Sequence, residues 1–417
     1  MIKIDLERPE SFVYMKCIFV LFIISLIISC NRKPERLPIT ETNRNDSLYV
    51  IDLDSTEKLN EISISSFFSK VELIILETTD ESIIGEVSDF QVFDDYFYIL
   101  DCRHERQLKV FDREGKYIRS IGNLGRGPGE YSSLSSFTID AENKEILLLC
   151  DGGKTINKYD MNGIPVSKIL INKMTFLYTD FIRVLDDKIF ANTFYRVKDT
   201  AGEDYLLQMI DSSTGEQEAC FLKTIQNNKG WNERYFMKPG LFSTNFGGIP
   251  KFIPLLSDTI FSIDKNGITP FLTIKSKHLL TQNDVKQAKR KDLKFDEQID
   301  VIRKTGKIQS IHNYLEFNGL IYFQYWHEQP YRFLFNPSTD YIEITNFIRN
   351  DLLHKNGKMS VNLNFADQNN VYECIEANSY LMRLLKEASQ QGELTTGNRQ
   401  LAELSDEANP VIIRYSN

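Results

Sequence analysis

The sequence predicts an all-β protein: a six-bladed β-propeller of four-stranded antiparallel blades, closed by N- and C-terminal strands and carrying two short helical inserts. Three observations support this prediction: a turn pattern that recurs about every 50 residues, a second hairpin pattern ahead of it, and strand-like segments at both ends of the repeats. With 417 residues, 42% hydrophobic and only 12 prolines, the chain can bury a large core. Its net charge of −9 argues against nucleic acid as a partner.

The recurring turn is of the Asx type. At residues 111–122 the sequence FDREGKYIRSIG joins two alternating strands through an Asp and a Gly. Asp or Asn opens such a turn because its side chain accepts a hydrogen bond from the backbone two residues on, and Gly supplies a positive φ. The predicted turn openers, spaced by 48, 51, 53 and 72 residues, are Asp112, Asp160, Asp211, Asp264 and Asn336.

A second hairpin pattern precedes these turns, at residues 89–101, 137–151, 181–193 and 314–325. The last one contains Asn-Gly, the strongest short hairpin signal. Each unit therefore holds about four strands in two hairpins. One such sheet cannot bury both faces alone, whereas sheets stacked around a common axis can.

The two ends of the chain are expected to close the ring. Residues 71–77 (VELIILE) are predicted to pair beside the last strand, residues 410–415 (PVIIRY). The sixth blade would then combine residues 359–375 with these two strands. A tandem β-sandwich is the alternative architecture.

The N-terminal residues resemble an export signal. Residues 17–28 form an apolar run of 12, whereas about 20 residues are needed to span a bilayer as a helix. The run ends in Ile-Ile-Ser-Cys, which resembles a bacterial lipobox, whose Cys is acylated. We expect a signal peptide at 1–29 (Met15 is an alternative start), lipid attachment at Cys30, a tether at 30–48 and the propeller at 49–417. The alternative is a buried strand that ends in a chance Cys.

A further stretch carries a family resemblance. Residues 121–140, IGNLGRGPGEYSSLSSFTID, are similar to the NHL-type propeller repeat. Together with the lipobox, residues 76–86 (LETTDESIIGE) and residues 409–415 (NPVIIRY), they resemble the six-bladed β-propeller lipoproteins of Gram-negative gut anaerobes. The resemblance covers residues 50–417 in organisation but is motif-specific only in roughly 70–165. It implies a fold and a location rather than a reaction.

The same resemblance bears on the side of the membrane. In this lipoprotein class, acidic residues after the lipidated Cys accompany surface export, whereas here Asn31, Arg32 and Lys33 follow it. We therefore expect an outer-membrane lipoprotein that faces the periplasm rather than the cell surface. The sequence does not predict the oligomeric state.

Four cysteines remain after the leader: Cys102, Cys150, Cys220 and Cys374. They contain no C-x-x-C pair, so no metal site is indicated. Equivalent points on neighbouring blades are too far apart for a disulfide, and buried free thiols are expected.

Two inserts interrupt the repeats. Residues 275–307 carry ten Lys or Arg and five Asp or Glu and are expected to form a helical cap on the rim, or a basic docking surface for an anionic glycan, a lipid head group or a protein. Residues 376–390 are expected to form a helix whose apolar positions begin at Tyr380. Packing on the propeller flank is favoured over contact with a partner helix.

Few residues suggest a ligand site. The GRGPG sequence at 125–129 lacks the following helix that a phosphate loop requires, so it is interpreted as a tight turn between blades. Next to it, Arg126, Glu130 and Tyr131 could face the mouth of the central channel.

A second candidate is an aromatic platform for stacking on sugar, made by Tyr325, Trp326 and His327, for which core packing is the alternative. The sequence shows no catalytic constellation, metal motif or cofactor motif.

These observations favour a lipid-anchored, extracytoplasmic binding or scaffold module for a protein or glycan partner at the cell envelope. The alternative is an NHL-like lyase or hydrolase with its site at the channel mouth, built from residues scattered among blades. Two or more His plus acids around a metal-sized gap would favour the enzyme, and a mixed or apolar lining would favour binding. A membrane-bound sensor is disfavoured because no spanning helix follows.

Overall fold

The structure is a computed structural model that describes residues 48–171, 181–198, 204–231, 241–243, 248–290, 292–357, 359–396 and 399–417. The predicted signal peptide, Cys30 and residues 31–47 lie outside this set, so the leader and the anchor stay predictions. Among the described residues, no helix is both long and apolar enough to cross a bilayer.

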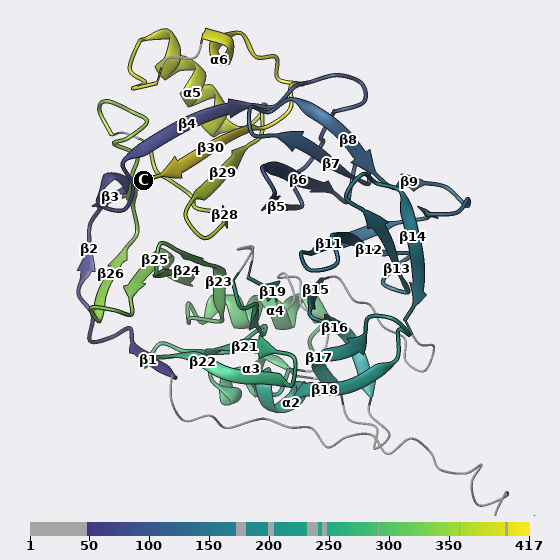
Figure 1. The fold of residues 1–417 in the computed structure, drawn as a ribbon. Coiled ribbons are helices and arrows are strands. Elements are labelled where there is room, and N and C mark those ends of the chain that lie inside the picture. Colours follow the sequence, from purple (N-terminus) through teal and green to yellow (C-terminus); the bar gives the residue numbers. More distant parts are fainter. Residues whose placement is uncertain are drawn as a thin grey trace, which may run out of the picture. The chain divides into compact units, whose positions relative to one another are not determined.

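Six β-sheets surround a central channel, as the prediction required (Figure 1). Each blade runs from an inner strand to an outer strand. Blade 1 consists of β5 (Asp89–Phe93), β6 (Tyr96–Asp101), β7 (Gln107–Asp112) and β8 (Tyr117–Ile121). Blade 2 consists of β11 (Leu134–Asp140), β12 (Glu145–Cys150), β13 (Thr155–Asp160) and β14 (Pro165–Leu170). Blade 3 consists of β15 (Ile182–Leu185), β16 (Lys188–Lys198), β17 (Asp204–Asp211) and β18 (Gln217–Lys223).

Blades 4 to 6 complete the ring. Blade 4 contains β19 (Leu241–Phe242), β20 (Lys251–Ile253), β21 (Thr259–Asp264) and β22 (Gly267–Lys275). Blade 5 contains β23 (Ile311–Phe317), β24 (Leu320–His327), β25 (Gln329–Asn336) and β26 (Tyr341–Thr345). Blade 6 contains β28 (Phe365–Ala366), β29 (Val371–Ile375), β30 (Val411–Ser416) and β4 (Lys70–Ile75).

The predicted closure is confirmed. Strand β4, near the start of the described chain, pairs antiparallel with the C-terminal strand β30, with Ile75 opposite Val411 and Val71 opposite Tyr415. The first and last strands therefore share the sixth sheet, and the ring is held shut by backbone hydrogen bonds between the two ends of the repeat region.

The predicted Asx turns are confirmed as well. Oδ1 of Asp112 accepts hydrogen bonds from the backbone N–H groups of Glu114 (3.1 Å) and Lys116 (2.8 Å). The bond from the residue two positions on recurs in all the other predicted turns: Asn162 to Asp160 (2.9 Å), Ser213 to Asp211 (2.9 Å), Asn266 to Asp264 (2.7 Å) and Ser338 to Asn336 (3.0 Å).

The turn glycines of blades 1 and 3 also set the contact between blades. Gly115 has a φ of 88°, and a Cβ there would stand 2.5 Å from the carbonyl oxygen of Ile75 in the preceding blade. A Cβ on Gly215 would stand 2.4 Å from the carbonyl oxygen of Leu170. A side chain at either position would push neighbouring blades apart. These glycines therefore provide both the positive φ of the turn and the space for the neighbouring blade.

The N-terminal part of the described chain adds strands that the prediction of four-stranded blades did not include. β1 (Tyr49–Asp52) pairs parallel with β22 of blade 4, and β2 (Lys58–Leu59) pairs parallel with β26 of blade 5. β3 (Ile62–Ser63) pairs parallel with β27 (Ile348–Arg349), and a short 3-10 helix, η1 (Ile64–Ser66), follows. Blades 4 and 5 thus have five strands each.

The added strands fill the outer ends of two blade interfaces. The ring of Tyr49 lies edge-on to Phe271 of blade 4 (5.5 Å between centroids) and to Phe335 of blade 5 (5.3 Å). Ile51 is buried in the same cluster, and Ile64 is buried at the interface of blades 5 and 6.

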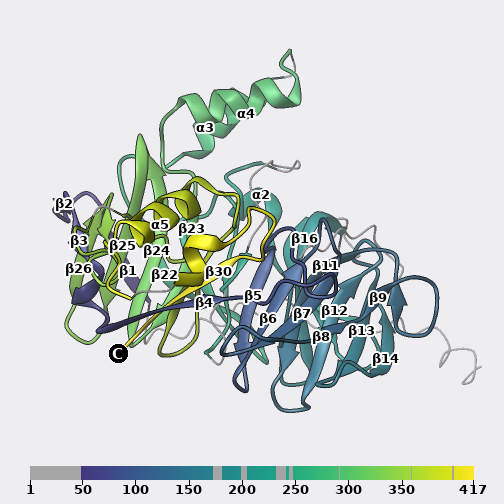
Figure 2. The ribbon, with the colours of Figure 1, turned by 90° about the horizontal axis from the view of Figure 1, so that it is seen from above.

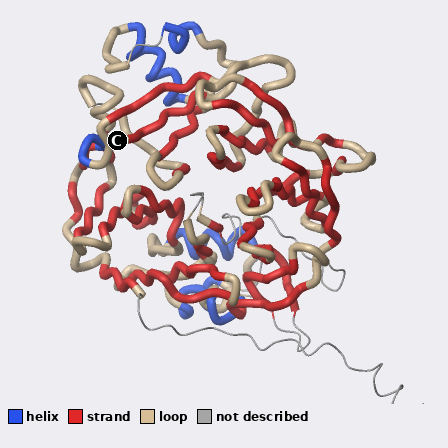
Figure 3. Tube along the Cα trace, viewed as in Figure 1, coloured by secondary structure: helices blue, strands red, loops and turns tan. Residues whose placement is uncertain are grey.

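In Figure 3 the helices at the top lie outside the ring of strands, whereas those in the lower half overlap the blades in this view. The insert at 275–307 forms α3 (Gln282–Ala288) and α4 (Phe295–Lys304), which stand off one face in Figure 2 and share a small core with Trp231 and Leu256. Its role as a docking surface stays a prediction. The short helices α2 (Thr224–Asn227) and α6 (Arg399–Glu403) were not predicted.

The second insert forms α5 (Tyr380–Gln390), which packs on the core through Met382, Leu385 and Ala388. The prediction that Tyr380 belongs to the apolar face was wrong, because this side chain is 68% exposed. Tyr380 is the first residue of α5 and lies outside the face formed by Met382, Leu385 and Ala388. The four cysteines are free, with Cys150 and Cys220 buried and Cys102 and Cys374 half-buried.

Candidate functional site

A cavity of about 680 Å³ opens into the central channel at the end where the innermost strands begin. Strands β5, β15, β19, β23 and β28 approach the axis here (Figure 1), and the wall residues come from these strands, from β29 and from the segments next to them. The polar and aromatic residues of the wall include Ser88, Asp89, Phe181, Arg183, Phe242, Ser310, His312, Asn313, Tyr314, Asn362, Asn364, Phe365, Glu373, Glu376 and Ser379. We call this space the channel cavity.

An ion pair links blades 1 and 3 next to the inner strand of blade 2. Nη2 of Arg183 lies 3.7 Å from Oδ2 of Asp89, and both side chains are nearly fully buried. Nη1 of Arg183 also donates to the backbone carbonyls of Ile182 (2.9 Å) and Phe137 (3.3 Å). Burial lowers the pKa of Arg183, and the charge of Asp89 opposes that shift.

A smaller cavity of about 320 Å³ lies farther along the channel, where the inner hairpins turn. Its wall includes Gln91, Thr138 and Asp186, and Arg183 lines both cavities. Arg183 therefore lies at the boundary of the two cavities.

An irregularity in β23 shapes the wall in blade 5. The pairing of β23 with β24 shifts between His312 and Leu315, and Asn313 in between has a φ of 48°. Such a bulge re-aims side chains. Here Nδ2 of Asn313 donates to the carbonyl of Leu363, while Ser310 Oγ lies 3.4 Å from Nε2 of His312. Burial lowers the pKa of His312, so its imidazole is neutral at pH 7.

Blade 6 places a buried carboxyl group in the wall. Glu373 sits in the middle of β29, is 2% exposed, and accepts a hydrogen bond from the backbone N–H of Asn362 (3.1 Å). Burial raises the pKa of Glu373 to about 8, and the backbone bond from Asn362, the charge of Arg332 and a hydrogen bond with Tyr415 only partly offset that effect. At pH 7 this side chain is mostly a neutral carboxylic acid, able to donate a hydrogen bond.

Amide side chains of the segment before β28 complete the polar wall. Oδ1 of Asn362 accepts from Nε2 of Gln324 (2.9 Å), which holds the amide in place. The buried Oδ1 of Asn364 has no hydrogen-bond partner among the described residues. Apolar and aromatic side chains occupy the rest of the wall, so the lining is mixed.

Arg126, Glu130 and Tyr131, predicted near the channel mouth, lie elsewhere. They belong to the connection that runs through β9 (Asn123–Leu124) and β10 (Glu130–Tyr131), on the outer side of the ring (Figure 1). None of them lines either cavity. The reason is topological: this connection leaves the outermost strand of blade 1, so it begins at the periphery. Ligand binding by these residues stays a prediction.

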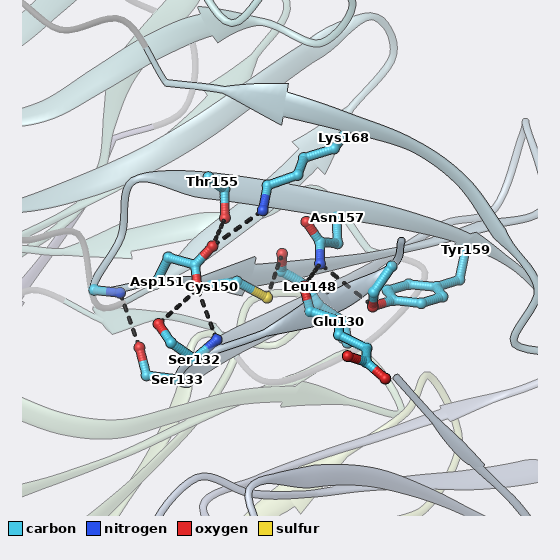
Figure 4. A network of polar contacts seen from close by, with 12 residues as sticks. Glu130, Ser132, Ser133, Leu148, Cys150, Asp151, Thr155, Asn157, Tyr159 and Lys168 are labelled. Atoms are coloured by element: carbon cyan, nitrogen blue, oxygen red, sulfur yellow. Dashed lines mark hydrogen bonds and ion pairs between the residues drawn. The ribbon is translucent and has the colours of Figure 1, made fainter. Parts of the chain in front are cut away.

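The two residues of β10 fasten this loop to the ring. The carboxylate of Glu130 accepts from the backbone N–H of Gly127 (2.6 Å), and Tyr131, 1% exposed, donates its hydroxyl to the carbonyl of Arg106 (2.9 Å). Figure 4 shows that the backbone of Glu130 is also held by Nδ2 of Asn157 in blade 2. The GRGPG segment is therefore a turn between blades, as expected.

A polar network on Asp151 ties the following residues to the same blade (Figure 4). Oδ1 of Asp151 accepts from the backbone N–H and the hydroxyl of Ser132, both at 2.8 Å. Oδ2 accepts from the Thr155 hydroxyl (2.8 Å) and from Nζ of Lys168 (3.2 Å). Burial works to raise the pKa of Asp151, but these hydrogen bonds outweigh it and lower the pKa to about 2.

The predicted aromatic platform is divided between core and surface. Tyr325 is buried and stacks on Tyr331 (5.4 Å between centroids), whereas Trp326 is 54% exposed at the tip of the β24–β25 hairpin. The ring of His327 lies 4.2 Å from that of His278, at the base of the helical insert. Sugar stacking on Trp326 stays a prediction.

By the criterion set from the sequence, the channel cavity favours binding. The described residues that line it include a single histidine among mixed polar and apolar groups. Across the described part of the chain, no three His, Cys, Asp or Glu side chains are grouped as metal ligands would be. None of these wall residues was predicted from the sequence; the one signal for them is that residues at the start of each predicted inner strand face the axis.

Residues 48–416 match a family model described as "Domain of unknown function (DUF4934)". A candidate exported protein from Bacteroides fragilis NCTC 9343 is similar in structure, with a TM-score of 0.61 and 16% identity over 89% of this chain and 100% of that chain. A member of the DUF4221 family from Bacteroides vulgatus ATCC 8482 follows, with a TM-score of 0.51 and 11% identity over 84% and 97%. These likenesses show the fold alone. No curated protein matches the sequence.

Proposed function

The chain belongs to the family described as Domain of unknown function (DUF4934), and on that premise we propose that it is an extracytoplasmic binding module that holds a protein or glycan partner at the channel cavity. A lipid on Cys30 would anchor it at the outer membrane, facing the periplasm. The NHL-like segment at 121–140 serves in this proposal as a connection between blades rather than as a site.

The observation that carries the proposal is the channel cavity itself. Its volume of about 680 Å³ falls within the range of small-molecule sites, about 300–1,000 Å³, and its wall combines apolar surface with a few fixed polar groups. Strands of several blades fix those groups, so the site is largely formed before a ligand arrives. A part of a glycan or of a protein chain could enter it from the open end.

Two observations support the extracytoplasmic location. The N-terminal sequence resembles a lipoprotein signal, and a protein of similar fold is a candidate exported protein. Replacing the acylated residue tests the anchor directly: Cys30→Ala should release the protein from the membrane fraction. Retention of the variant in that fraction would contradict lipid anchoring at Cys30.

Capture of the partner tests the binding role. Asn362 is exposed at the cavity wall, so Asn362→Trp would block the cavity at little cost to the fold. Asn369→Trp, in the β28–β29 turn of the same blade, is the matched control because Asn369 is exposed and lies outside the wall.

Pull-downs from detergent-solubilised membranes should recover the same partner or polysaccharide with the wild type and with Asn369→Trp, but not with Asn362→Trp. Equal recovery by both variants, or no specific partner with the wild type, would contradict binding at the channel cavity.

One observation favours the alternative, an enzyme of the NHL-like type. Two titratable groups of the wall have pKa values shifted in opposite directions, upward for Glu373 and downward for His312, as acid–base pairs in enzymes do. Release of a modified product from a bound partner, abolished by Glu373→Gln, would favour this alternative.

A further inference from the structure

We propose that the ligand of the channel cavity is a neutral saccharide of one or two rings, held by amide, hydroxyl and carboxylic acid groups and by aromatic side chains rather than by charge. This inference rests on the proposed function and specifies its ligand.

The balance of charge in the wall is the first argument. Of the described residues that line the channel cavity, Arg183 is the one cation, and it is paired with Asp89. Its Nη1 and Nη2 groups also donate to backbone carbonyls of Phe137, Ile182 and Ser243. A carboxylate or phosphate ligand would have to break this pair, at the cost of leaving a buried charge unmatched. Glu376, exposed at the rim, adds negative charge that also disfavours anions.

The titratable groups of the wall give the second argument. Glu373 holds its proton at pH 7 and His312 is neutral. A cationic ligand therefore finds no buried carboxylate to pair with other than Asp89, which Arg183 already holds. Neutral ligands avoid the desolvation penalty of an unmatched charge.

The hydrogen-bonding groups of the wall match hydroxyl groups, which both donate and accept. Oδ1 of Asn364 is a buried acceptor with no partner among the described residues. Nδ2 of Asn362 also has no partner in that set, while its Oδ1 is held by Gln324. Together with the acid group of Glu373, the wall offers donors and acceptors side by side. A buried unsatisfied polar atom carries a free-energy cost that a ligand hydroxyl can remove.

Aromatic side chains supply the remaining contact surface. Phe181, Phe242 and Phe365 line the cavity from three different blades, and Tyr314 is a fourth aromatic residue of the wall. The hydroxyl of Tyr314 donates to Glu316 (2.8 Å), so its ring is fixed in place. Rigid aromatic faces bury the apolar C–H faces of a sugar ring while the polar groups bond its hydroxyls.

Calorimetric titration of the full chain in detergent at pH 6.5 tests the ligand class. The neutral probes are galactose, mannose, N-acetylglucosamine, maltose and cellobiose; the charged probes are glucuronate, glucosamine and glucose 6-phosphate. We expect at least one neutral probe to bind with a millimolar or lower Kd, and the charged probes to bind at least tenfold more weakly. Equal or tighter binding of a charged probe, or no binding of any neutral probe, would overturn the proposal.

Variants locate the bound probe. Asn364→Leu removes the amide while keeping the side chain similar in size, and should weaken binding at least tenfold. Asn369→Leu, the matched control outside the wall, should change the Kd less than twofold. If both variants bind as the wild type does, the saccharide binds outside the cavity and the proposal fails.

A pH series supplies a signature that loss of fold does not produce. Binding should weaken as the pH rises from 6.5 to 9, because Glu373 ionises and can no longer donate. Glu373→Gln keeps a donor at every pH, so its affinity should stay level across the series. A decline in the variant equal to that in the wild type would contradict the role of Glu373.

The outcomes separate the two proposals. If Asn362→Trp abolishes capture of the partner while no neutral saccharide binds, the cavity is the binding site and only the ligand class is wrong. If a saccharide binds and the blocking variant does not affect it, binding at the channel cavity is wrong as well.

Discussion

The β9–β10 loop and the channel cavity use polar side chains in opposite ways. In the loop, Glu130 is bonded to Gly127 and Tyr131 to Arg106, and beside it Asp151 is bonded to Ser132, Thr155 and Lys168. In the cavity wall, Asn362 and Asn364 keep groups without partners among the described residues. Glu373 keeps a proton that it can donate.

This difference separates stability from binding. A polar group whose bonds are all made inside the protein contributes to the fold and has little left for a ligand. A polar group fixed by its neighbours but not satisfied by them is preorganised for one. Variants of the loop should therefore lower stability without changing affinity, and variants of Asn362 and Asn364 in the wall should lower affinity with little change in stability.

The largest expected effect is on the loop. Tyr131→Ala should lower the free energy of unfolding by about 3–5 kcal/mol, because a fully buried aromatic ring leaves a cavity between blades 1 and 2. Urea denaturation measures the change, and Tyr380→Ala, at an exposed tyrosine, should cost less than about 0.5 kcal/mol. Partner capture at a temperature where Tyr131→Ala is folded should be unchanged; its loss would end the distinction between the two regions.

The next effect concerns the cavity wall and pH. The pKa of Glu373 is raised from 4.5 to about 8, so between these values the folded state keeps a proton that the unfolded state has lost. Stability should therefore fall as the pH rises from 5 to 8, with this residue contributing up to about 1.4 kcal/mol per pH unit.

Urea denaturation at pH 5, 6, 7 and 8 measures that slope, and Glu373→Gln should flatten it. Glu376→Gln, exposed at the rim of the same cavity, should keep the wild-type slope. Equal slopes in the wild type and in Glu373→Gln would show that this carboxyl group is not protonated in the fold.

A smaller effect is expected at Asp151. Its pKa is lowered to about 2, so its stabilising contribution is present above about pH 4 and is lost as the pH falls toward 2. Asp151→Asn should cost about 1 kcal/mol at pH 7, since the carboxylate is partly exposed and screened. The melting temperature of the variant should then fall less steeply between pH 4 and 2. A variant as acid-sensitive as the wild type would show that Asp151 does not contribute to the loss of stability in acid.

The smallest effect is expected at the surface platform. Trp326 is 54% exposed, so Trp326→Ala should change stability by less than about 0.5 kcal/mol and the affinity for the cavity ligand by less than twofold. A tenfold loss of saccharide affinity with unchanged stability would move the site from the channel to the hairpin tip.

Local patterns made the fold predictable. The Asx openers and the Asn-Gly hairpin at 318–319 act through bonds between neighbouring residues, which a single sequence reveals. The closure of β4 on β30 followed from the need to bury unpaired strands at both ends. The added strands β1 and β2 were not predictable, because segments as short as YVID and KL carry too little pattern to indicate a strand and pair only where a blade edge lies within reach.

The candidate site was beyond sequence reasoning for a related reason. Asp89, Arg183, His312 and Glu373 come from four blades and are separated by dozens of residues, so no motif joins them. Their charge state and their access to the channel depend on burial, which a single sequence does not give residue by residue. The GRGPG segment stands out in the sequence because its residues are contiguous, but they form a turn between blades and line neither cavity.

Amide hydrogen exchange of the full chain, measured with and without the ligand recovered by partner capture, tests the central claim most directly. We expect the ligand to slow amide exchange in β23, in the segment 362–366 and in β29, which meet at the channel cavity, and to leave exchange in β9 and β10 unchanged. Protection confined to β9 and β10, with the cavity strands unchanged, would contradict it.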